Sequence, residues 1–184
     1  MIKLLISDLD DTLYDWTGFF VPAFYAMADE IARMTGIDEK KLLNEYMAAH
    51  QRLGSVEYPY ATLELPSIKA YYNNAPAEEM KAALRPAFNV FNSVRESHLH
   101  LLPGVEEMLR ALTEMGVTLI AYTESSKENG FYRLMKLGLE PYFKHVYTFE
   151  SQFKSAYAVS EKVRTVQTKK PDVAVIERIC AGEG

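Results

Sequence analysis

A short apolar run that ends in acidic residues, close to the start of the chain, is the feature that most constrains its fold. Residues 2–7 are rich in Leu and Ile, and Asp8, Asp10 and Asp11 follow directly. A run this short, bounded by turn-forming residues, is typical of a buried strand in a parallel sheet. The sequence therefore predicts a strand whose carboxyl end presents carboxylates to solvent.

The spacing of these acids favours a functional site. Asp8 and Asp10 are two residues apart, so both side chains can reach one cavity, whereas Asp11 points elsewhere. Two carboxylates this close repel each other unless a shared proton or a cation relieves the repulsion, and Mg²⁺ prefers such oxygen ligands. The alternatives are an incidental cation site and an acidic loop that caps a helix beginning near Thr12, because Asp and Thr are good N-caps.

The second half of the chain alternates between helical and strand patterns. Strands are predicted at residues 117–122 and 145–149, and helices at 105–115, at 127–137 and after Pro171. Residues 151–168 give no clear assignment. Alternation of this kind predicts an α/β fold, with a parallel sheet covered by helices on both faces.

Residues 17–97 differ, because their apolar side chains recur at helical spacing. An amphipathic helix is predicted at 18–35, and Asp38 is a candidate N-cap for a second helix that Gly54 ends. A further helix is predicted at about 63–72, and two more follow. The chain is thus divided into an α/β core, residues 1–16 and 98–184, and a helical insertion, residues 17–97.

Composition excludes several classes of protein. The chain has 184 residues, 48% of them hydrophobic, and a net charge of -5, which argues against a nucleic-acid groove or an anionic membrane surface. The single cysteine, Cys180, cannot form an internal disulfide. We find neither a signal peptide nor an apolar segment long enough to span a bilayer. A cytoplasmic protein with a small soluble substrate is expected.

Three motifs resemble those of the haloacid dehalogenase superfamily of phosphotransferases and phosphatases. Asp8–Leu13 is similar to the first motif, D-x-D-x-T-L. Thr123, at the end of an apolar strand, resembles the second motif, and Lys170 before a proline resembles the third. Lys169 is adjacent, so a shift of one residue stays open. Glu124 departs from the pattern, which has a small or amide residue there.

The resemblance implies a Rossmann-like core, a covalent mechanism and a role for each motif. Asp8 would attack phosphorus, Asp10 would act as general acid and base, and Thr123 and Lys170 would bind the phosphate. Mg²⁺ would be held by Asp8 and Asp10. Residues 17–97 would form a helical cap that closes over the substrate. Aromatic side chains near the start of the insertion either line its entrance or pack in the core: Tyr14, Trp16, Phe19 and Phe20.

Substrate and activity are left more open. The second acid, Asp10, favours a phosphatase over a dehalogenase, and a phosphomutase stays possible. A sugar phosphate or a nucleotide would suit the site, with no nucleic-acid or membrane partner expected, and the oligomeric state is open. The family's fourth motif, an acidic pair after one more strand, is not found before Gly184. Either the sequence is a truncated form of a longer protein, or metal binding is weakened or lost and the protein is a binding or regulatory relative. Without the last strand, an edge of the sheet would be exposed.

Overall fold

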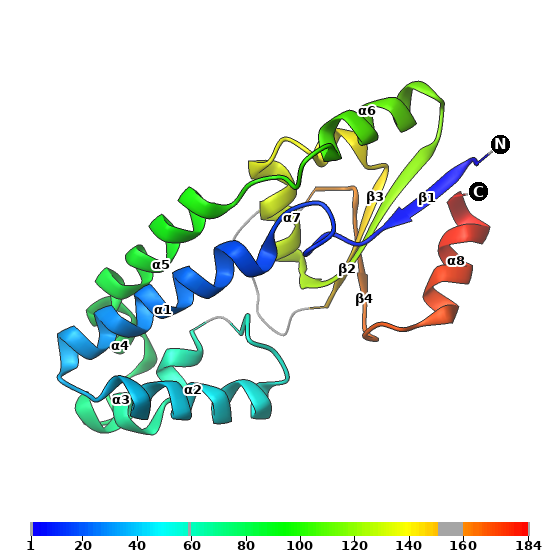
Figure 1. Ribbon diagram of the computed structural model, residues 1–184. Helices are drawn as coiled ribbons and strands as arrows, with labels where there is room; N and C mark the ends of the chain where they lie inside the picture. Colours follow the sequence, from blue (N-terminus) through cyan, green and yellow to red (C-terminus); the bar gives the residue numbers. More distant parts are fainter. Residues whose placement is uncertain (1, 59, 151–159, 184) are drawn as a thin grey trace. The chain divides into compact units, whose positions relative to one another are not determined.

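The computed structural model describes residues 2–58, 60–150 and 160–183 (Figure 1). The chain divides into two compact units. We call Met1–Trp16 together with Leu99–Gly184 the core unit, and Thr17–His98 the helical unit.

The core unit is built on a parallel sheet of four strands in the order β1-β2-β3-β4. The strands are β1 (Leu4–Ser7), β2 (Thr118–Ser126), β3 (His145–Phe149) and β4 (Val163–Val166). The strand predicted at 145–149 is confirmed, whereas the one predicted at 117–122 continues to Ser126. Strand β4 lies in the segment that the sequence left unassigned. Its four residues contain only two apolar side chains, too few to show a periodicity.

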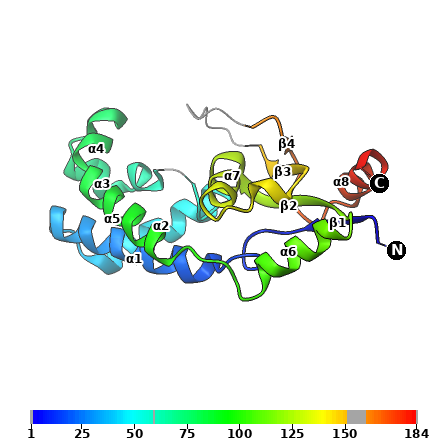
Figure 2. The ribbon, with the colours of Figure 1, turned by 90° about the horizontal axis from the view of Figure 1, so that it is seen from above.

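Helices cover both faces of this sheet, which confirms the predicted α/β fold. They are α6 (Val105–Glu114), α7 (Lys127–Lys136) and α8 (Val173–Glu183), with a short 3-10 turn, η2, at Glu140–Tyr142. Figures 1 and 2 show α6 and α7 on one side of the sheet and α8 on the other. On the α8 side, Val175 and Ile179 pack against Ile120 and Tyr122 of β2.

The buried face of α8 is narrower than its apolar sequence pattern predicts. Val173, Ile176, Ile179 and Cys180 all lie within a helical apolar pattern, yet only Ile179 among them is buried. Val175, four residues before Ile179, completes the packed pair. Residues four apart share one face of a helix, and the stripe that reaches the sheet is therefore narrow.

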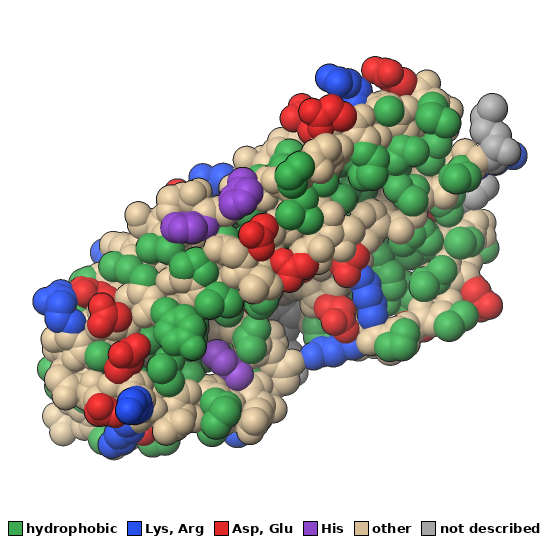
Figure 3. Space-filling view, in the orientation of Figure 1, with side chains coloured by type: hydrophobic (Ala, Val, Ile, Leu, Met, Phe, Trp, Pro, Cys, Tyr) green, Lys and Arg blue, Asp and Glu red, His purple; other side chains and the backbone are tan. Residues whose placement is uncertain are grey.

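Strand β1 forms one edge of the described sheet, because its only strand partner there is β2. Large hydrophobic side chains are exposed before β1 and on α6 and α8: Ile2, Met108, Val173 and Ile176. Figure 3 shows hydrophobic side chains gathered on the core unit between α6 and α8, in the region of β1. This side of the core unit thus combines an unpaired strand edge with exposed apolar surface.

The helical unit is a bundle around its own hydrophobic core. Its elements are α1 (Trp16–Thr35), α2 (Glu39–Leu53), the 3-10 helix η1 (Ala61–Glu64), α3 (Pro66–Tyr71), α4 (Ala77–Ala83) and α5 (Arg85–His98). Buried side chains of α1, α2 and the later helices form one cluster, which includes Ile31, Leu42, Tyr46, Ile68 and Leu84. None of the helices in the described ranges is both long and apolar enough to cross a bilayer.

Local signals in the sequence set the helix ends in this unit. Asp38 caps α2, because its carboxylate accepts a hydrogen bond from the Lys41 amide at 3.0 Å. Gly54 ends α2 with a φ of 71°, a conformation that glycine adopts without strain. The helix predicted at 63–72 is split into η1 and α3, since Pro66 lacks the amide hydrogen needed to continue a helix and instead opens α3.

Candidate active site

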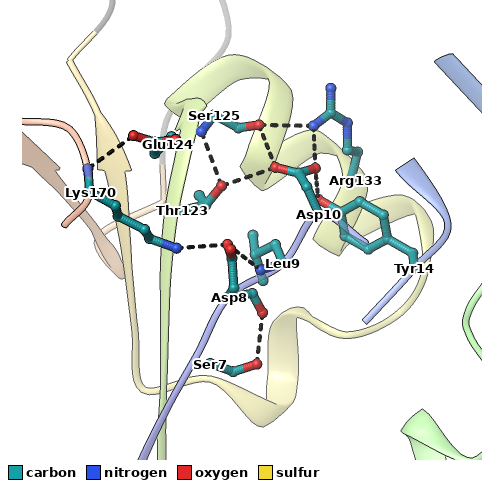
Figure 4. Close-up of polar contacts among 10 residues, drawn as sticks. All are labelled: Ser7, Asp8, Leu9, Asp10, Tyr14, Thr123, Glu124, Ser125, Arg133 and Lys170. Carbon is teal, nitrogen blue, oxygen red and sulfur yellow. Dashed lines mark hydrogen bonds and ion pairs between the residues drawn. The ribbon is translucent and has the colours of Figure 1, made fainter. Parts of the chain in front are cut away.

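The candidate site lies where β1 and β2 end side by side. Their parallel register pairs Ser7 with Ala121, so Asp8 and Asp10 come near Thr123 although more than a hundred residues separate them in sequence. Ligands of open parallel sheets bind at the carboxyl ends of the strands. Figure 4 shows that the two acids point in different directions from the same loop.

Asp8 faces a lysine from a distant part of the core unit. Its Oδ1 atom lies 2.8 Å from Lys170 Nζ and accepts a hydrogen bond from the Leu9 amide at 2.7 Å (Figure 4). The Asp8 side chain is 45% exposed. An exposed carboxylate with one fixed cation beside it remains accessible to a ligand from solvent.

Lys170 is held from two sides in the loop between β4 and α8. Its Nζ lies 4.8 Å from the centre of the Tyr122 ring, a cation–π contact. Its backbone amide donates a hydrogen bond to Glu124 Oε1 at 2.9 Å. Lys169 instead lies over the ring of Phe149, at 5.8 Å from its centre. The structure therefore brings Lys170, rather than Lys169, to Asp8. Glu124 has a structural role, because it holds the loop that carries Lys170.

Asp10 has a different environment, because hydrogen-bond donors surround its carboxylate. Oδ1 accepts from the Tyr14 hydroxyl and from Arg133 Nη1, both at 2.8 Å. Oδ2 accepts from Ser125 Oγ at 2.7 Å and from Thr123 Oγ1 at 3.1 Å. The Asp10 side chain is 24% exposed and Arg133 only 4%. Figure 4 shows the five side chains converging from β2, α7 and the loop after β1.

The alternation of side chains along β2 explains how neighbouring residues reach both acids. Successive side chains of a strand point to opposite faces of the sheet, so residues two apart share one face. Thr123 and Ser125 both turn to Asp10, and the Ser125 amide also donates to Thr123 Oγ1 at 3.0 Å. Glu124, between them, reaches the Lys170 loop instead. The segment therefore contacts both halves of the site.

Sequence reasoning missed Ser125 and Arg133 as members of this site. A buried stripe on α7, Gly130-Arg133-Leu134, contained the signal, since an arginine on an apolar face needs a partner. Gly130 belongs to the same arrangement. A Cβ there would lie 3.3 Å from the Thr123 methyl group, so glycine lets α7 approach β2 closely.

Tyr14 belongs to the core rather than to an entrance. Its side chain is fully buried, and so is that of Phe19. Burial raises the pKa of Tyr14 well above its usual value, the charge of Asp10 and its hydrogen bond act in the same direction, and the nearby Arg133 guanidinium opposes the shift. Its hydroxyl therefore remains protonated at every ordinary pH and stays a donor to Asp10.

The site offers a small set of oxygen ligands for a metal ion. Within the described part of the chain, no group of three or more His, Cys, Asp or Glu side chains is arranged to hold a metal. The Asp10 carboxylate already accepts from four donors, which leaves the Asp8 carboxylate, and the family resemblance adds the Asp10 main-chain carbonyl. Mg²⁺ often binds proteins through one or two carboxylates and completes its shell with water and substrate phosphate. This donor set fits such a loosely held ion.

Comparisons with known proteins agree on one family. The family model described as haloacid dehalogenase-like hydrolase matches residues 2–180. A curated relative, the glyceraldehyde 3-phosphate phosphatase of Pyrococcus abyssi, is 26% identical over 157 residues, which are 79% of this chain. The matched region spans 59% of the length of that enzyme.

Two solved structures show the same fold. One is a putative β-phosphoglucomutase from Thermotoga maritima, with a TM-score of 0.52 and 23% identity over 89% of this chain and 75% of that one. The other is a phosphatase of the same superfamily from Thermococcus onnurineus, with a TM-score of 0.53 and 19% identity over 80% of this chain and 62% of that one.

Proposed function

We propose that this chain, which belongs to the family of haloacid dehalogenase-like hydrolases, is a phosphatase that hydrolyses a small phosphomonoester through a phosphorylated Asp8. The observation that supports this most directly is the ion pair of Lys170 Nζ with Asp8 Oδ1 at 2.8 Å. A phosphate ester and an attacking carboxylate are both negative, so a fixed cation at that point lowers their repulsion. The Thr123 hydroxyl, which donates to Asp10 Oδ2 at 3.1 Å at the same end of the sheet, is the phosphate ligand that we propose beside Lys170.

Asp8 and Asp10 divide the chemistry in this proposal. Asp8 attacks phosphorus, and the bond from phosphorus to the leaving oxygen breaks. Asp10 gives a proton to that leaving oxygen. It then takes a proton from the water that hydrolyses the aspartyl phosphate. One difficult displacement is thus split into two easier ones.

A Mg²⁺ ion would be held by the Asp8 carboxylate and the Asp10 carbonyl. When bound, it supplies positive charge that offsets the negative charge of the phosphoryl group. Lys170, in the loop between β4 and α8, also supplies positive charge beside Asp8. The proposed magnesium dependence is open to a direct test with a chelator.

The substrate class rests on composition and on the curated relative. That relative is named for glyceraldehyde 3-phosphate, and we extend its class to this chain as a small phosphorylated metabolite, such as a sugar phosphate. The net charge of -5 suits a small ligand better than a nucleic acid. We also propose that the helical unit acts as a cap over the substrate, and that the protein works in the cytoplasm.

The test measures phosphate release from a panel of alkyl and aryl phosphomonoesters that includes glyceraldehyde 3-phosphate. The wild-type chain is assayed with Mg²⁺ and with chelator, beside Asp8→Asn, which keeps the shape of the side chain and removes its charge. We expect turnover that needs Mg²⁺ and is lost in Asp8→Asn. A folded wild-type protein that releases no phosphate from any ester would contradict the proposal and favour a binding role.

A further inference from the structure

Arg133 is a buried charge beside the site, and the steps proposed above give it no role. Its side chain is 4% exposed on α7, and Nη1 lies 2.8 Å from Asp10 Oδ1 and 3.0 Å from Ser125 Oγ. A buried guanidinium is unfavourable unless it is paired and hydrogen-bonded. The position of Arg133 is therefore tied to Asp10.

The directions of the surrounding hydrogen bonds follow from their donors. Ser125 Oγ accepts from Arg133 and donates its own hydrogen to Asp10. Thr123 Oγ1 accepts from the Ser125 amide and also donates to Asp10. With the Tyr14 hydroxyl, the Asp10 carboxylate thus meets four donors, one of them charged. This arrangement is complementary to an ionised carboxylate, because only that form accepts at every position.

We propose that Arg133 is a positioning residue for Asp10, and that it stabilises the negative charge that Asp10 acquires when it protonates the leaving oxygen. The inference rests on the proposed phosphatase function. Arg133 touches neither the substrate nor the phosphoryl group in this role. It acts through Asp10, both directly and through Ser125.

Asp10 transfers its proton to the leaving oxygen in this proposal. The O–H bond of protonated Asp10 breaks and leaves its electron pair on the carboxylate. The proton bonds to the leaving oxygen, which has taken the electron pair of the broken P–O bond. Thr123 makes the longest of the four contacts, at 3.1 Å. In this proposal its hydroxyl leaves Oδ2 for the bound phosphate, which opens a position on Oδ2 for the proton. Arg133, Tyr14 and Ser125 remain to hold the carboxylate that forms.

This role predicts a dependence on the leaving group. An alkoxide is a poor leaving group and needs the proton from Asp10, whereas p-nitrophenolate leaves without one. Loss of Arg133 should therefore slow the release of an alcohol and spare the release of p-nitrophenol. A purely structural role would slow both reactions equally.

The experiment compares kcat/KM for p-nitrophenyl phosphate and for the best alkyl phosphomonoester of the panel, both measured on the same preparation. The variants are Arg133→Gln and Arg133→Lys, with Lys136→Gln on the same helix as a control for the change of charge. Arg133→Gln should lower the alkyl rate about 100-fold and the aryl rate by less than about 3-fold. Arg133→Lys should fall between Arg133→Gln and wild type, because it keeps the charge but loses the planar fork.

The ratio of the two rates is independent of the folded fraction, because both rates come from one sample. If Arg133→Gln does not fold, Arg133→Lys carries the same comparison. A double variant with Asp10→Asn completes the test: adding Arg133→Gln to Asp10→Asn should lower the alkyl rate by no more than about 3-fold further.

The outcomes separate a failure of the proposed role of Arg133 from a failure of the proposed phosphatase function. Equal losses on both esters, or additive losses in the double variant, would overturn the role of Arg133 while the wild-type turnover upholds the phosphatase. A wild-type protein that hydrolyses neither ester would overturn the proposed function, and this inference with it.

Discussion

The two halves of the site place an aspartate in very different environments. Asp8 is 45% exposed, and the one side-chain cation beside it in the described site is Lys170. Asp10, two residues later, meets four donors and is 24% exposed. A nucleophile must be reachable from solvent, whereas an acid that donates and regains a proton needs its charge held in place. The contrast supports the different roles that we propose for these two acids.

The largest expected effect separates the Asp8 side from the Asp10 side. Lys170→Met removes the cation next to Asp8 and should lower kcat/KM about 100-fold to 1000-fold, the usual loss when one electrostatic group is removed. The loss should be the same for alkyl and aryl esters, because it concerns the attack on phosphorus. Steady-state kinetics with both esters measures it. A loss confined to alkyl esters would contradict this prediction, because it would mean that Lys170 acts on Asp10 and not on Asp8.

On the Asp10 side, Tyr14→Phe removes one neutral donor. We expect kcat/KM for alkyl esters to fall about 5-fold to 10-fold, in line with the loss of one hydrogen bond of about 1 kcal/mol. The aryl rate should hardly change. Since the pKa of Tyr14 is raised by burial, this hydroxyl should add no step to the alkaline side of the wild-type pH profile. Equal losses with both esters would contradict this assignment.

Glu124 connects the two halves and should have a smaller effect. Glu124→Ala removes the acceptor for the Lys170 amide and should lower both rates about 5-fold, the equivalent of about 1 kcal/mol. Glu124→Gln keeps an acceptor oxygen and serves as the matched control, with rates close to wild type. Loss of activity in both variants would instead indicate that the charge of Glu124 matters.

The smallest effect is expected at Tyr122. Its ring contacts Lys170, and its hydroxyl is buried with no hydrogen-bond partner among the described residues. Tyr122→Phe keeps the ring and removes an unsatisfied group, so stability should be unchanged or higher by about 1 kcal/mol, with activity retained. Thermal unfolding measures this. A marked loss of stability would show that the hydroxyl has a partner after all.

The sequence was most informative where the signal is local. The β1 strand, the acids that follow it, the cap at Asp38 and the glycine at Gly54 were all predicted from neighbouring residues, and the structure has them. Strand β4 was not predicted, because four residues with two apolar side chains carry no periodicity. Pro66 divided a predicted helix for a reason that was visible in the sequence.

The site was only half visible in the sequence. Asp8 and Asp10 were predicted from the residues around them, the family resemblance added Thr123 and Lys170, and the structure places all four at one end of the sheet. Their roles stay predictions. The partners of Asp10 depend on long-range packing, since Arg133 comes from a helix more than a hundred residues away. An arginine within an apolar stripe predicts a buried partner, but only the folded structure identifies that partner.

The division of labour between Asp8 and Asp10 is tested most directly by trapping the intermediate. Asp10→Asn retains the nucleophile and lacks the base that activates water, so p-nitrophenyl phosphate should phosphorylate it faster than water can release the phosphate. Rapid acid quenching and peptide mass spectrometry should then find one phosphoryl group on Asp8, with a matching burst of p-nitrophenol. Turnover by wild type with no adduct on Asp8 in this variant, or with the adduct on another residue, would contradict the account.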